Sequence, residues 1–157
     1  MMEKITGSAH IRLEPVSISK VTPVEAYMGV AESLMPGMQL LINTPPFYAI
    51  PITLLAGHIL ECLLKAFLSK TGVSEKDLKD KKKFGHNLNK LWQGAANRKL
   101  PISSVLPPWA KRLSELHGSP YRLRYNSGRV HGFTLPNSQE LSSELTKLLE
   151  TVRREIR

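Results

Sequence analysis

The chain has 157 residues and carries 22 lysines and arginines against 13 aspartates and glutamates, for a formal net charge of +9. Its length suits one domain, and its 41% hydrophobic and 22% charged residues are typical of a globular fold and exclude a disordered chain. The single cysteine, Cys62, excludes an intramolecular disulfide. The positive charge favours a polyanionic partner such as RNA, although a basic surface that only keeps the protein soluble fits the charge equally well.

The first residues and the apolar segments indicate whether the protein is secreted or inserted in a membrane. Residues 1–15 lack the apolar stretch of a secretory signal, so we expect a cytoplasmic protein. The longest apolar run, residues 50–68, is almost as long as a membrane span, but His58, Glu61 and Lys65 interrupt it at high cost in hydrocarbon. We therefore expect a buried core helix and no membrane association.

The first elements expected along the chain are an arm and a helix. Residues 1–21 form an N-terminal arm that is irregular or contains a short strand at 10–14, where polar and apolar residues alternate. Thr22-Pro23 is typical of a helix start, and Pro36-Gly37 predicts that this helix is broken or kinked.

A long central helix is predicted from about Ile52 to Ser69, with Gly72 as its C-terminal cap. Nearly its whole circumference is apolar, so other helices must surround it. Further helices are expected near Ser74, after Gly85, from Trp109 and from Asn137. The sequence therefore predicts an all-α fold, an up-down bundle of four to six helices forming one domain over residues 22–157.

Three ionisable residues form a polar stripe on the central helix. His58, Glu61 and Lys65 are spaced by three and four, which places them on one face. Ionisable groups on so apolar a helix are costly unless they are paired or exposed. The stripe therefore either belongs to a functional site or polar network between helices, or lines a solvated edge with Glu61 bridging His58 and Lys65.

His86 is a further candidate, because it lies at an expected helix start beside the lysine run 81–83. A structural capping role fits this position as well as a functional one. No two histidines have a paired ligand spacing and no carboxylate cluster accompanies them, so the sequence predicts no metal site and no cofactor.

The segment 122–131 combines arginines, a tyrosine and a histidine. Arginine binds phosphate oxygens in pairs, tyrosine stacks on bases, and histidine can move the proton of an RNA 2′-hydroxyl. An ordinary basic surface loop is the alternative. The candidate residues in this segment are Arg122, Arg124, Tyr125, Asn126, Arg129 and His131.

The order of these features resembles HEPN domains, small helical bundles of prokaryotic toxin and defence systems. The resemblance spans roughly residues 50–150. It rests on AGHILECLLKAFL at 56–68, GHNL at 85–88 followed by Leu91-Trp92, and YRLRY at 121–125.

The resemblance implies a chemistry and an assembly. Active HEPN members are metal-independent endoribonucleases with an arginine, four to six intervening residues and then a histidine, and they usually act as dimers. Arg124 and His131, separated by six residues, match that pattern as the catalytic pair. Tyr125 stands where a small polar or acidic residue is usual, and Gly128 interrupts the helix that normally carries the motif.

Two functions follow as expectations. The first is a homodimeric endoribonuclease of a toxin or defence system, with Arg122, Tyr125, Asn126 and Arg129 binding substrate and the stripe with His86 in support. The second is a non-catalytic module that binds nucleic acid, a nucleotide or a protein partner, because many HEPN members lack the motif. An antitoxin-like or scaffolding role, with residues 47–50 as an interface, is a third.

Overall fold

The computed structural model describes residues 20–46, 48–121, 123–124 and 134–157. Within these ranges it contains helices and no strands, which confirms the predicted all-α bundle. The predicted N-terminal arm falls almost entirely on residues outside the described ranges. The helices are α1 (Pro23–Asn43), α2 (Ala49–Lys70), α3 (Glu75–Lys79), α4 (Leu88–Asn97), α5 (Pro108–His117) and α6 (Ser138–Glu155).

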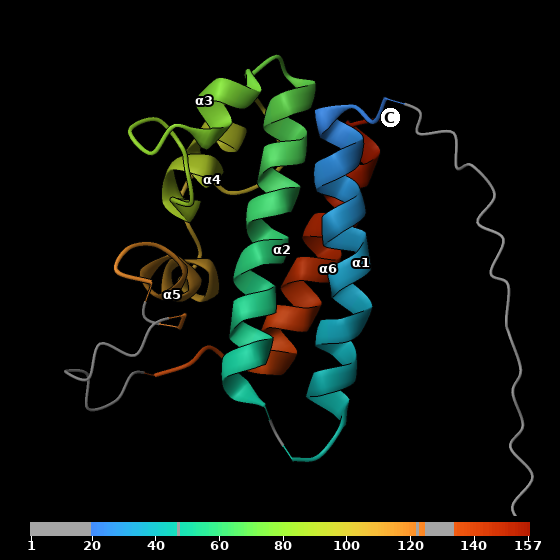
Figure 1. Ribbon diagram of the computed structural model, residues 1–157, viewed down its shortest axis with the longest axis vertical. Coiled ribbons are helices and arrows are strands. Elements are labelled where there is room, and N and C mark those ends of the chain that lie inside the picture. The colour runs from blue at the N-terminus through green and yellow to red at the C-terminus, as the bar shows by residue number, and fades with distance from the viewer. Residues whose placement is uncertain (1–19, 47, 122, 125–133) are drawn as a thin grey trace, which may run out of the picture.

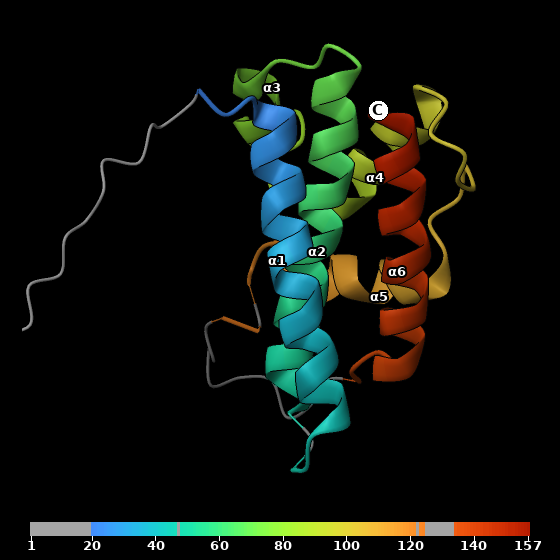
Figure 2. The same ribbon diagram turned by 90° about the vertical axis from the view of Figure 1, so that its right-hand side faces the viewer.

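The three long helices α1, α2 and α6 lie side by side, and the three short helices gather on the other side of α2 (Figure 1). Helix α1 runs antiparallel to α2, whereas α6 runs in the same direction as α2 (Figures 1 and 2). Helix α2 contacts every one of the other five helices. It is therefore the centre of the domain.

The composition of α2 explains its central place. Its side chains are buried around most of the circumference, as an all-round apolar helix requires. By length and composition α2 is the one described helix that could cross a membrane, but 78% of its most apolar window is buried inside the domain. The core helix predicted from the sequence is thus present, three residues longer at its start and one residue longer at its end.

Side-chain caps fix where most helices begin. Thr22 and Glu25 form a reciprocal capping box at the start of α1, as the Thr22-Pro23 pattern predicted. Ser74, Asn87 and Asn137 cap α3, α4 and α6 by accepting a hydrogen bond from the backbone N–H three residues later. At the other end of α2, Gly72 adopts a left-handed conformation with φ of +92° and turns the chain toward α3.

The predicted break at Pro36-Gly37 is wrong, because α1 continues without interruption to Asn43. Pro36 lies on the exposed side of the helix, where water can hydrate the carbonyl that loses its backbone partner. The neighbouring Met35 and Met38 are buried against the core. Packing of this apolar face therefore outweighs the local helix-breaking tendency of proline.

Candidate active site

The polar stripe of α2 is buried rather than solvated. Only 3% of Glu61 and 4% of Lys65 is exposed to solvent. The Lys65 ammonium donates a hydrogen bond of 2.7 Å to the Glu61 carboxylate, so the two opposite charges are paired inside the protein. The predicted polar network is present, and the alternative of a solvated edge is wrong.

Two histidines from other parts of the chain complete the network. The ring of His86 lies with Nδ1 at 3.0 Å from both Glu61 carboxylate oxygens. Buried His117, at the last position of α5, places Nε2 2.6 Å from Glu61 Oε2. We call Glu61, Lys65, His86 and His117 the Glu61 network. It connects α2, the loop before α4 and the end of α5.

Sequence reasoning singled out His86 but missed His117. A signal for its burial was present, since Trp109, Leu113 and Leu116 place the apolar face of α5 where His117 also lies. Gly57 of α2 makes the close approach possible. A Cβ atom at Gly57 would lie 2.5 Å from His117 Nδ1, so any larger residue there would push the ring away.

His58 does not join the network. Its Nε2 lies 3.9 Å from the Cys62 Sγ atom, one helical turn away on the same helix, and no hydrogen bond to Glu61 is present. Burial lowers the pKa of His58 below its ordinary value, since it disfavours the charged ring. Of the predicted stripe, Glu61 and Lys65 thus belong to the network, and His58 lies next to it.

The charges around Glu61 decide its protonation. Burial alone would raise the pKa of Glu61, but the hydrogen bonds from His117 and Lys65 and the charge of Lys65 act in the opposite direction and hold the pKa well below its ordinary value. The carboxylate is therefore ionised at neutral pH. An ionised carboxylate can only accept hydrogen bonds, so Nδ1 of His86 donates its N–H to Glu61, and Nε2 of that ring stays outside this hydrogen bond.

The same donor set raises the question of a metal ion. Glu61, His86 and His117 offer ligand atoms that all lie within 4.8 Å of one another, a convergence that spacing along the chain could not show. Histidine and carboxylate ligands suit zinc. However, Lys65 Nζ lies only 2.7 Å from the same carboxylate, and its positive charge opposes a divalent cation there. The geometry fits a hydrogen-bonded network better than a metal centre.

The exposed edge of His86 lines a hollow of about 270 Å³, which we call the His86 hollow. In contrast to His117, the His86 side chain is 43% exposed. The rings of His86 and Tyr121 meet edge to face with centroids 6.3 Å apart. The other residues lining this hollow are Lys81, Phe84, Asn87, Ser114, Gly118 and Ser119.

Tyr121 lines the His86 hollow, and Arg124 lies against the Tyr121 ring. Tyr121 adopts a left-handed backbone conformation with φ of +56°, which is uncommon for so bulky a residue and costs about 1–3 kcal/mol. The exposed Arg124 places its guanidinium 5.6 Å from the Tyr121 ring centroid. Of the predicted catalytic pair, Arg124 therefore contacts Tyr121, one of the residues that line the hollow.

The remaining candidates of the segment 122–131 lie outside the described residues. They are Arg122, Tyr125, Asn126, Arg129 and His131. The assignment of Arg124 and His131 as a catalytic pair therefore stays a prediction.

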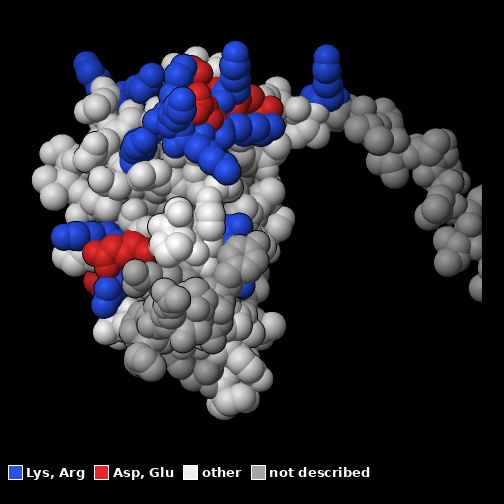
Figure 3. Space-filling view, turned by 60° about the vertical axis from the view of Figure 1, so that its left-hand side comes forward, with Lys and Arg blue, Asp and Glu red and all other residues white. Residues whose placement is uncertain are grey.

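Positive charge gathers next to this site. Lysines and arginines cluster at one end of the molecule, with a few carboxylates among them (Figure 3). The lysine run 81–83 is exposed and lies in the loop that leads to His86, and Lys81 itself lines the His86 hollow. Lys83 pairs with Asp77 at 2.6 Å, whereas Lys81 and Lys82 form no ion pair within the described part of the chain. These two positive charges are available to an anion.

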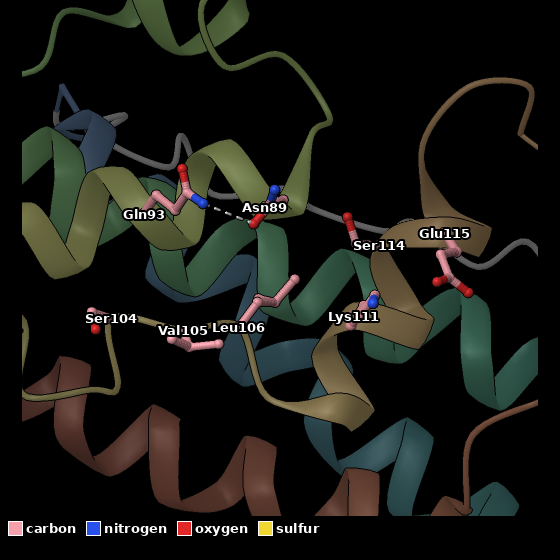
Figure 4. A pocket seen from close by; sticks show the side chains of 8 residues that line it. All are labelled: Asn89, Gln93, Ser104, Val105, Leu106, Lys111, Ser114 and Glu115. Atoms are coloured by element: carbon pink, nitrogen blue, oxygen red, sulfur yellow. Dashed lines mark hydrogen bonds between the residues drawn. The ribbon is translucent and has the colours of Figure 1, made fainter.

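A second hollow, of about 460 Å³, lies between α4 and α5 (Figure 4). Ser114 lines both hollows, so the second hollow adjoins the first along α5. We call it the amide hollow, because Asn89 and Gln93 of α4 contribute carboxamides to its wall. Its other lining residues are Ser104, Val105, Leu106, Lys111, Ser114 and Glu115.

Comparison of the chain with protein-family models, with curated proteins and with solved structures finds no match.

Proposed function

We propose that this chain is a HEPN-like domain that binds single-stranded RNA at the His86 hollow and cleaves it without a metal ion. The observation that carries the proposal is the Glu61 carboxylate 3.0 Å from Nδ1 of His86, a half-exposed ring that lines a hollow together with Tyr121 and Lys81. Arg124 lies against the Tyr121 ring. A buried carboxylate that fixes one ring nitrogen of a histidine orients the other nitrogen for proton transfer.

The proposed chemistry assigns a task to each group. His86 Nε2 accepts the proton of the ribose 2′-hydroxyl, and the resulting oxygen attacks the neighbouring phosphorus. The Arg124 guanidinium stabilises the negative charge that develops on the phosphate oxygens, and the Tyr121 ring stacks on a base. His131, assigned from the sequence, donates a proton to the departing 5′-oxygen, so the products are a 2′,3′-cyclic phosphate and a 5′-hydroxyl.

The wider setting of the proposal comes from the HEPN resemblance. It includes a cytoplasmic homodimer in which two motifs face each other, and a role in a toxin or defence system. Arg122, Tyr125, Asn126 and Arg129 are proposed to contact the RNA near the cleaved bond.

The test is cleavage of a fluorescent single-stranded RNA in excess EDTA, with the product ends identified by mass spectrometry. We expect a cyclic phosphate end, and a loss of at least a hundredfold in rate in His131→Ala and in His86→Gln. Lys147→Ala, an exposed position on α6 that pairs with Glu144, is the matched surface control and should cleave at the original rate.

Circular dichroism and thermal unfolding must show that each variant is folded. Cleavage that survives both histidine substitutions in folded protein, or that requires a divalent ion, contradicts the proposal.

A non-catalytic RNA-binding module is the second candidate, and a specific observation favours it. Both carboxylate oxygens of Glu61 already have partners, which are Lys65, His86 and His117. The carboxylate of Glu61 is therefore fully occupied in connecting the helices. This candidate predicts that RNA binds with the same hollow and the same lysines but is never cut.

Salt dependence measures the RNA contacts that both candidates share. Each phosphate contact on a single strand contributes about −0.7 to the slope of log K against log salt concentration. Changing Lys81 and Lys82, the two lysines without an ion pair in the described part of the chain, to glutamate should weaken RNA binding and make this slope shallower by about 1.4. Binding that is indifferent to salt and to this charge reversal would exclude a role in nucleic-acid recognition.

A further inference from the structure

The amide hollow has the size and the lining of a ligand site. Its volume of about 460 Å³ lies in the usual range for sites that enclose small ligands, whereas the His86 hollow at about 270 Å³ lies below it. Figure 4 shows Asn89 and Gln93 of α4 above, residues 104–106 below them, and Lys111, Ser114 and Glu115 of α5 to the right.

The polar groups of the amide hollow suit the edge of a base. Gln93 Nε2 donates a hydrogen bond of 3.4 Å to Asn89 Oδ1, which orients the two carboxamides relative to each other. This arrangement leaves a carbonyl oxygen on Gln93 and an amide nitrogen on Asn89 for a ligand. Carboxamides present a donor and an acceptor side by side, and they pair with the N6 and N7 groups of adenine in two hydrogen bonds.

The apolar groups and the charges of the hollow fit the same ligand. Val105 is 72% exposed and Leu106 is half-buried, so together they offer an apolar surface to the flat face of a base. Glu115 pairs with Arg112 at 2.8 Å, which compensates its negative charge. Lys111 is exposed and forms no ion pair within the described residues, so its ammonium can meet a phosphate.

The position of the hollow connects it to the His86 hollow. Ser114 lines both, and Asn87 and Asn89, two residues apart at the start of α4, line one hollow each. The two hollows therefore adjoin, so that one RNA strand can reach from one into the other. We propose that the amide hollow binds the base of a nucleotide next to the one at the His86 hollow and prefers adenine. This inference rests on the RNA binding proposed above and specifies which RNA is bound.

The test compares fluorescent hexamers of adenosine and of uridine, with binding measured by fluorescence anisotropy and cleavage measured in parallel. We expect the adenosine hexamer to bind about tenfold more tightly or better. Gln93→Met should remove most of this preference. Gln139→Met is the matched control, because Gln139 is an exposed glutamine on α6 that lines neither hollow and should leave the preference intact.

Each outcome separates this inference from the proposed cleavage. A preference that is absent, or that survives Gln93→Met in folded protein, overturns the adenine subsite even if RNA is cut. A preference that depends on Gln93 in a protein that never cuts RNA sustains the subsite and overturns the nuclease. Free AMP that binds as tightly as the adenosine hexamer would assign the hollow to a free nucleotide and overturn the RNA subsite.

Discussion

Glu61 is the residue on which three elements of the domain converge. Its carboxylate is 3% exposed and binds a lysine one turn away on the same helix together with two histidines that are 25 and 56 residues distant along the chain. A buried charge of this kind is tolerated only because its partners compensate the loss of water. Removing the charge therefore affects every partner at once.

Substitution of Glu61 by glutamine tests this dependence. The change leaves the buried Lys65 ammonium without a counter-charge, so we expect the free energy of unfolding to fall by about 3–5 kcal/mol in urea denaturation at pH 7. Adding Lys65→Met to the same protein should recover part of the loss, because the unpaired charge is then gone. A double variant less stable than Glu61→Gln alone would show that the unpaired charge of Lys65 is not the main cause of the lost stability.

In helix α2 a glycine gives His117 the space it needs to reach the Glu61 network. Gly57 lies one helical turn before Glu61 and allows His117 of α5 to approach the helix backbone. In α1, by contrast, nothing lies within 4 Å of the Cβ atom that alanine would add at Gly37. Two glycines inside long helices therefore have opposite roles.

Alanine substitution at these two glycines should change stability in opposite directions. Gly37→Ala should raise the free energy of unfolding by about 0.5–1 kcal/mol, because alanine favours the helix and meets no obstacle. Gly57→Ala should lower it by about 1–3 kcal/mol, since the added methyl group would displace the buried His117 ring. Thermal unfolding measured under one buffer condition checks both. Equal signs for the two changes would contradict the assigned role of Gly57.

Local sequence patterns predicted the helices of the whole molecule but not the contacts between distant segments. The apolar circumference of α2 and the capping residues Thr22, Ser74 and Asn137 are local signals, and the helices they predicted are present. The approach of His117 to Glu61 depends on how α5 packs against α2, so the sequence offered no spacing that could predict it. Pro36 failed as a helix breaker because packing of the whole α1 face outweighed a local preference.

The candidate site likewise has residues that the sequence singled out and hollows that it could not predict. Glu61 and Lys65 were singled out by residue type and helical spacing, and His86 by its place beside an expected helix start, while the role of each was left open. The two hollows arise where the loop before α4, the segment 104–106 and α5 meet, and only the assembled fold brings these together.

The long-range contacts of Glu61 also have a consequence for how fast the protein folds and unfolds. They close chain segments of 25 and 56 residues, and the entropy of closing them must be lost before the contacts form. We therefore expect the network to be absent from the folding transition state. In stopped-flow measurements Glu61→Gln should accelerate unfolding and leave the refolding rate nearly unchanged. The network would then contribute mainly kinetic stability, because it slows unfolding and so lengthens the time that each molecule stays folded.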